Sequence, residues 1–206
     1  MSDESSSTGD NQNSLTVVGD AHRLEAFSDS VMAVIITIMA FNLKTPVSAN
    51  LHGLAGRVPS ILVYILSFTF VGIYWNNHHH LLRATRRISG AVMWANLHLL
   101  FWLSLIPFAT AWVGGAHADA LPASVYGVVA LGAALAYFAL ERLILKANVD
   151  HVAIRRAVGK DVKGIVSPLI YAGGVALAFV SPYLAYCCYA IVAIIWFVPD
   201  RRLSAV

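Results

Sequence analysis

The sequence predicts an all-α membrane protein with six transmembrane helices per chain. Of its 206 residues, 58% are hydrophobic and 12% are charged, and the mean hydropathy is +0.69. A soluble globular domain carries roughly 25% charged residues. Six apolar stretches fit helices that cross a hydrocarbon core about 30 Å thick, and the positions of Lys and Arg favour an even number of spans. No sizeable soluble domain fits beside them. The chain has no basic runs interleaved with aromatics outside the spans, which argues against a nucleic-acid partner.

The N-terminal segment is polar and precedes the first span. Its first twenty residues hold four acids, no Lys or Arg, and many Ser, Asn and Gly, a composition typical of disorder. We expect residues 1–22 to form a disordered cytoplasmic tail and residues 23–202 to form the transmembrane domain. The tail lacks the basic and apolar regions of a cleaved signal peptide, so the first span itself is expected to direct insertion.

Hydropathy places the six spans in order along the chain. They are expected at about 26–43, 58–75, 88–112, 121–140, 165–180 and 183–198. The last two are short and are separated by Ser181-Pro182, which favours a tight hairpin over one re-entrant element. Small-residue stretches in the fourth and fifth spans, GVVALGAALA and AGGVALA, predict close packing of helices.

The basic residues orient the spans. With a cytoplasmic N-terminus, the segments on the inner side hold twelve of the fourteen Lys and Arg residues, and only Lys44 and Arg57 fall outside. Cytoplasmic loops carry an excess of Lys and Arg. Both termini are therefore predicted to lie in the cytoplasm, since an odd number of spans would place Arg201 and Arg202 outside.

Asp29 lies one turn inside the first span, where an acid is costly unless it is paired. Polar groups of the next two spans lie at the same depth if the orientation is right. These groups are Trp75, His78, His79 and Asn96, with Ser28 and Arg23 on the first helix. Groups at matching depth on adjacent helices can satisfy one another. Asp29 is therefore predicted to be a structural clasp between helices.

An apolar stripe runs along another face of the first helix. At 100° per residue, Val34, Ile38 and Phe41 lie within about 40° of one another, and Asp29 lies about 140° from Val34. The residues Phe27, Ser30 and Thr37 extend the same stripe. Lipid solvates such a stripe as well as protein does, so periodicity alone favours plain packing over a functional face.

The motif Arg23-x-x-x-Phe27-Ser28-Asp29, followed by an Ile/Val-rich helix, resembles the first-helix signature of the transmembrane protein 175 family. Further motifs that resemble this family are Trp75 before the His-rich end of the second span, Asn96-Leu97, and Ile106-Pro107-Phe108. The resemblance covers the six-span layout, and its specific motifs lie in the first half of the chain. Members of that family are potassium-permeable channels of lysosomal membranes and prokaryotic cell membranes.

The resemblance implies an unconventional tetrameric channel in a prokaryotic inner membrane, with the first helices around the axis. It assigns the pore constriction to Val34, Ile38 and Phe41, and the polar layer of the pore to Thr37 and Ser30. It assigns an interhelical network to Arg23, Phe27, Ser28, Asp29, Trp75, His78, His79 and Asn96. The implied partners are the other copies of the chain, membrane lipid, and potassium and other monovalent cations. No cofactor is implied.

Selectivity is expected to be weak, because the chain has no TVGYG-like run to supply a filter of backbone carbonyls. Two positions depart from the family pattern. Phe41 stands where an aliphatic residue is commoner, and Asn42 stands where many relatives have an acid. Lys44 lies about 80° off the stripe and is expected to snorkel away from the axis.

Three other classes of site are weighed from the sequence. Consecutive helical residues point 100° apart, so at most two of His78, His79 and His80 could share a metal ion, and none is expected to bind one. A membrane enzyme using the cluster of Ser28, Asp29 and histidine would need a base on another helix. A secondary transporter usually shows inverted repeats and broken helices, and no internal repeat is visible.

Overall fold

The computed structural model describes residues 4–116, 118–148 and 162–197, and it describes side chains from Ala21 onward except that of Val162. The described residues form helices, which confirms the all-α prediction. The helices are α1 (Glu4–Phe41), α2 (Leu51–Ala55), α3 (Val58–Ala84), α4 (Gly90–Ser104), α5 (Ile106–Gly115), α6 (Ala120–Ala147), α8 (Val162–Leu177) and α9 (Pro182–Phe197).

Local sequence signals set several helix starts. Pro59 and Pro107 occupy the first turns of α3 and α5, where a missing N–H costs nothing. Ser89 caps α4, since its hydroxyl accepts the Val92 N–H at 3.3 Å. Asn50 caps α2 in the same way through Gly53 at 2.8 Å. The third predicted span is therefore two helices, α4 and α5, joined at Leu105.

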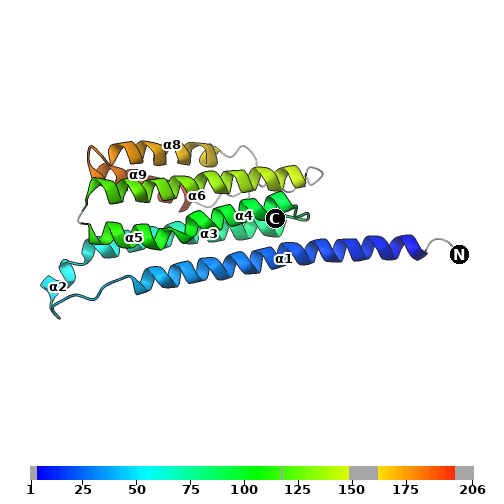
Figure 1. The fold of residues 1–206 in the computed structure, drawn as a ribbon, viewed down its shortest axis with the longest axis horizontal. Helices are drawn as coiled ribbons and strands as arrows, with labels where there is room; N and C mark the ends of the chain where they lie inside the picture. Colours follow the sequence, from blue (N-terminus) through cyan, green and yellow to red (C-terminus); the bar gives the residue numbers. More distant parts are fainter. Residues whose placement is uncertain (1–3, 117, 149–161, 198–206) are drawn as a thin grey trace.

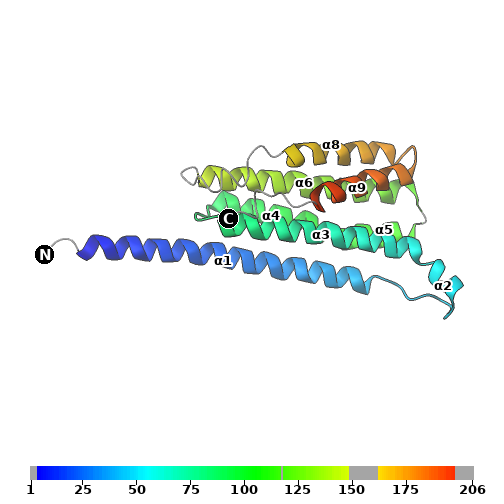
Figure 2. The same cartoon turned by 180° about the vertical axis from the view of Figure 1, so that it is seen from behind.

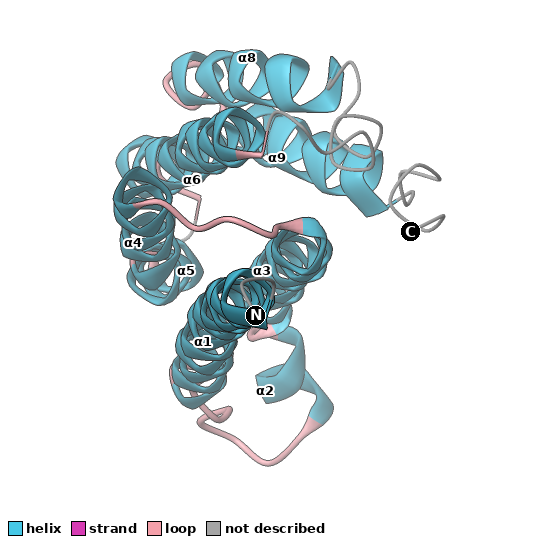
Figure 3. Ribbon diagram, turned by 90° about the vertical axis from the view of Figure 1, so that its right-hand side faces the viewer, coloured by secondary structure: helices cyan, strands magenta, loops and turns pink. Residues whose placement is uncertain are grey.

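The helices lie side by side along one axis (Figures 1 and 2). In the end-on view, α6, α8 and α9 form one side of the bundle, while α1 and α3 lie on the opposite side (Figure 3). The main contacts run from α4 to α6, from α6 to α8 and from α8 to α9, and α1 packs on α3, α4 and α5. Helix α1 thus lies at an edge of the bundle, with one face uncovered.

Small residues let helices approach closely around α6, as the small-residue stretches predict. A methyl group at Gly132 would lie 2.3 Å from the ring of Trp102 on α4. One at Gly127 would lie 2.0 Å from the hydroxyl of Tyr189 on α9. Both distances are far inside van der Waals contact, so glycine is required at these positions for the observed packing.

A chain of buried hydroxyl groups crosses the middle of the bundle. The Thr110 hydroxyl donates to Ser67 Oγ at 2.7 Å, and Ser67 Oγ lies 3.0 Å from the Tyr126 hydroxyl. Thr110 also contacts Met39 Sδ at 3.9 Å. These residues come from α5, α3, α6 and α1, so the chain satisfies buried polar atoms across four helices.

Four stretches in the described residues are long and apolar enough to cross a membrane. They are Ala21–Phe41, Val58–Arg83, Gly90–Gly115 and Ala120–Ala147. Helices α8 and α9 have 16 residues each, which is roughly 24 Å at 1.5 Å per residue. This falls short of a core about 30 Å thick, and the count of six spans stays a prediction.

The first helix of the structure reaches far toward the N-terminus. It draws α1 from Glu4, through residues that the sequence predicts to be a disordered tail. Extending an existing helix adds one hydrogen bond per residue without a new nucleus, which is how a polar segment can continue α1. The domain boundary at residue 22 stays a prediction. Arg201, Arg202 and the basic residues in 149–161, which entered the orientation argument, lie outside the described residues.

Candidate pore-lining helix and interhelical network

Helix α1 is joined to helix α4 by a hydrogen bond in a fully buried site. Asn96 donates from Nδ2 to Ser28 Oγ at 2.9 Å, and Ser28 donates in turn to the Leu24 carbonyl at 2.8 Å. Asn96 Oδ1 lies 2.7 Å from His78 Nε2 on α3. Ser28, Asn96 and His78 are each 0% exposed. One asparagine therefore ties α1, α4 and α3 together at one depth.

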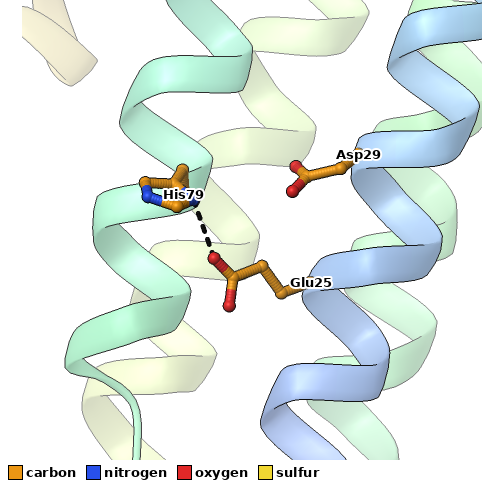
Figure 4. Close-up of side chains that lie close together, drawn as sticks. All are labelled: Glu25, Asp29 and His79. Atoms are coloured by element: carbon orange, nitrogen blue, oxygen red, sulfur yellow. Dashed lines mark ion pairs between the residues drawn. The ribbon is translucent and has the colours of Figure 1, made fainter.

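A second contact between α1 and α3 uses a residue outside the predicted network. The carboxylate of Glu25 lies 2.7 Å from His79 Nδ1, and its Oε1 lies 3.8 Å from Arg83 Nε. The ring of Trp75 stacks on His79 with 5.8 Å between centroids. Figure 4 shows Glu25 pointing from α1 toward the histidine. The i, i+4 relation of Glu25 to Asp29 was the signal that could have found it.

Asp29 does not form the expected clasp by hydrogen bonding. Its Oδ1 is enclosed but has no hydrogen-bond partner among the described residues. Its carboxylate faces the space between Glu25 and His79 (Figure 4), and the ligand atoms of the three residues lie within 4.8 Å of one another. The buried role predicted for Asp29 is carried instead by Ser28, one residue earlier on the helix.

Two residues predicted for the network stay outside it in the single chain. Phe27 is 50% exposed. Arg23 is exposed and has no ion pair among the residues that the structure describes. Both lie on α1 near the turn that holds Ser28. Within the described part of the chain, no side-chain hydrogen bond or ion pair joins either residue to α3 or α4.

The face of α1 that carries the predicted constriction is uncovered. Val34, Ile38 and Phe41 are 57%, 45% and 83% exposed. The opposite face is packed into the bundle through Met32, Ile35 and Met39. These six apolar positions are thus divided between two faces of α1, as the 100° periodicity requires.

The two hydroxyls on the uncovered face are satisfied within their own helix. Ser30 donates to the Ala26 carbonyl at 2.8 Å, and Thr37 donates to the Ala33 carbonyl at 2.9 Å. Both residues are exposed. Each oxygen keeps its acceptor lone pairs, so it can accept a hydrogen bond from water or contact a cation.

The chain is similar in sequence to proteins described as potassium channels. A family model described as the endosomal/lysosomal potassium channel TMEM175 matches residues 23–107. A potassium channel of Chryseobacterium sp. strain P1-3 is 45% identical over 182 residues, which cover 88% of this chain and 95% of that one. A potassium channel of Streptomyces collinus is 30% identical over 207 residues, covering 91% and 99%.

A solved structure is similar over nearly the whole chain. The crystal structure of a lysosomal potassium-selective channel TMEM175 homolog from Chamaesiphon minutus matches with a TM-score of 0.76 and 27% identity. The match covers 89% of this chain and 98% of that one. None of these relatives is described as an enzyme or a transporter, so the two rival classes find no support.

Proposed function

Because the chain belongs to the TMEM175 family of potassium channels, we propose that four copies assemble around a pore lined by α1. The channel sits in a prokaryotic inner membrane, crosses it six times and keeps both termini in the cytoplasm. It passes K⁺ and other monovalent cations with weak selectivity. The family is one of channels and not of enzymes, so no substrate chemistry is assigned to the cluster around Ser28 and Asp29.

The observation that carries this proposal is the uncovered face of α1. Large apolar side chains at Val34, Ile38 and Phe41 lie outside the bundle of their own chain. Four copies of these residues around an axis form stacked rings spread over about 10 Å. A hydrophobic ring that is narrow enough to dewet stops ions without a charged gate.

Polar positions on the same face account for passage once the pore is wet. Ser30 and Thr37 place hydroxyl oxygens on the uncovered face, spaced among the apolar side chains. A monovalent cation that sheds part of its hydration shell can replace it with such oxygens. Because no carbonyl filter contributes, K⁺ and Na⁺ differ mainly in the cost of dehydration, and discrimination is modest.

The experiment is planar-bilayer recording of purified protein, with K⁺ on one side and Na⁺ on the other. Ile38→Asn is expected to raise the current, because an amide in the narrowest ring favours water there. Ile191→Asn on α9 is the matched control, because Ile191 is exposed to a similar degree, 49% against 45%, on another face of the bundle. We expect its current to equal that of the unchanged protein.

Two results would contradict the proposal. Equal currents from Ile38→Asn and the unchanged protein, with the tetramer intact by native mass spectrometry, would show that Ile38 on α1 does not form the constriction. A monomer or dimer that still conducts would remove the four-fold pore. The reversal potential in the same recordings measures selectivity, and strong exclusion of Na⁺ would overturn the weak selectivity proposed here.

A further inference from the structure

We propose that Glu25, Asp29 and His79 bind one divalent transition-metal ion, Zn²⁺ or a close relative, between α1 and α3. Glu25 and Asp29 lie four residues apart on one face of α1, and His79 faces them from α3 (Figure 4). One ligand atom from each residue lies within 4.8 Å of the other two. This site is separate from the pore face, and its test needs no current measurement, so it does not rest on the proposed function.

The donor set suits zinc. Imidazole nitrogen and carboxylate oxygen bind Zn²⁺ at about 2.0–2.2 Å, so ligand atoms in a tetrahedral site lie roughly 3.4 Å apart. The Glu25 and His79 ligand atoms are 2.7 Å apart, and the ligand atoms of the three residues lie within 4.8 Å of one another, a range that includes this value. Three protein ligands leave a fourth position for water. The Glu25 and His79 side chains are 15% and 24% exposed, so the site is not fully enclosed by the chain.

A second observation points to a missing ligand. Asp29 Oδ1 and His79 Nδ1 are both enclosed, and neither has a hydrogen-bond partner among the described residues. His79 Nδ1 lies 2.7 Å from Glu25 Oε1, with which it forms an ion pair when the imidazole is protonated. Enclosed polar atoms are normally satisfied. One cation at the centre of the three residues would satisfy both atoms and relieve the repulsion between two neighbouring carboxylates.

The neighbouring charged and aromatic groups allow this arrangement. Arg83 lies 3.8 Å from Glu25, but its side chain is 70% exposed and can move into solvent when a cation binds. His78 does not belong to the group of ligand atoms that lie within 4.8 Å of one another, and its Nε2 is engaged by Asn96. The stacking of Trp75 on His79 restricts rotation of the imidazole ring, and a ligand that is held in one orientation favours metal binding.

The test is calorimetric titration of the full chain in detergent with ZnCl₂. The starting protein carries Cys187→Ala and Cys188→Ala, because free thiols are strong zinc ligands. We expect one site per chain. Glu25→Gln and His79→Gln are each expected to raise the Kd for Zn²⁺ by at least ~10-fold. Substituting a residue that only orients a metal ligand already costs that much affinity. His52→Gln is the matched control, because His52 is exposed on α2 and Kd should not change.

Thermal melts of the same proteins show whether each variant is folded. Zn²⁺ should raise the Tm of the starting protein and of His52→Gln, and should raise that of Glu25→Gln by less at the same Zn²⁺ concentration. Glu25→Gln decides the matter if His79→Gln does not fold, because glutamine keeps the volume and the hydrogen-bonding oxygen. Absence of saturable binding to the starting protein, or an undiminished affinity in Glu25→Gln, overturns the proposal.

Discussion

Substituting Ser28 with alanine tests whether the buried contact between α1 and α4 holds these helices together. Ser28 and Ser30 form a matched pair, because each donates to the carbonyl four residues earlier at 2.8 Å. Only Ser28 also accepts a hydrogen bond, from Asn96 Nδ2 at 2.9 Å. The difference between Ser28→Ala and Ser30→Ala therefore isolates the interhelical bond, since helix propensity and the local bond change equally in both.

The magnitude follows from burial. Interhelical hydrogen bonds in membranes average about 0.6 kcal/mol and reach about 1.7 kcal/mol. Removing the Ser28 hydroxyl also leaves an Asn96 N–H unpaired at a site with 0% exposure, and an unsatisfied buried group costs about 1–3 kcal/mol. Where these ranges overlap, Ser28→Ala is expected to lower the free energy of unfolding by about 1–2 kcal/mol more than Ser30→Ala.

The assay is reversible unfolding in mixed micelles, read by tryptophan fluorescence, on a double-mutant cycle of Ser28→Ala and Asn96→Ala. The two changes should couple by about 0.6–1.7 kcal/mol, because both remove the same bond. Additivity within about 0.5 kcal/mol is what independent sites give. Additive changes, or equal stabilities of Ser28→Ala and Ser30→Ala, would refute the argument.

Two further perturbations have expected outcomes elsewhere in the bundle. Gly174→Ala should lower the free energy of unfolding by about 1–3 kcal/mol through overpacking, because the added methyl would lie 2.5 Å from the Tyr189 ring. A methyl at Gly173 meets nothing within 4 Å, so Gly173→Ala should not destabilise the protein. Equal thermal melts for the two variants would contradict this. Asn148 accepts the Arg87 N–H at 2.9 Å and donates to the Arg87 carbonyl at 3.2 Å, so in Asn148→Ala the Arg87 amide should exchange with solvent up to about tenfold faster, since a hydrogen bond contributes about 0.5–1.5 kcal/mol. Unchanged exchange at that amide would show that Asn148 does not pin the loop.

The sequence predicts the helices well because bilayer thickness dictates their length. The expected second span, about 58–75, lies within α3, and the fourth, about 121–140, lies within α6. Hydropathy reads apolar length only, so it misses the extension of α3 to Ala84 through His-rich residues and the short helix α2 in the loop. It also cannot see the polar continuation of α1 to Glu4.

Part of the interhelical network was predicted by depth alone. Ser28, His78 and Asn96 were expected in one layer, and they form one hydrogen-bonded group. Depth does not say which of two carboxylates one turn apart reaches the next helix. That choice depends on the rotation of α1 against α3, and the structure gives the ion pair to Glu25 rather than to Asp29. The arrangement of four chains is likewise a property that hydropathy of one chain cannot express.

The layered packing of the bundle divides the chain by mutational tolerance. Helices α6, α8 and α9 pack chiefly on one another and on α4, and their interior is fixed by glycines set against aromatic rings. Substitutions there are filtered by volume, so one apolar side chain of similar size replaces another at little cost. On α1 the side chains are divided between the apolar core, the buried polar groups and the uncovered face, so both polarity and direction are constrained. Apolar exchanges of equal volume are therefore expected to be tolerated better in α6, α8 and α9 than on α1.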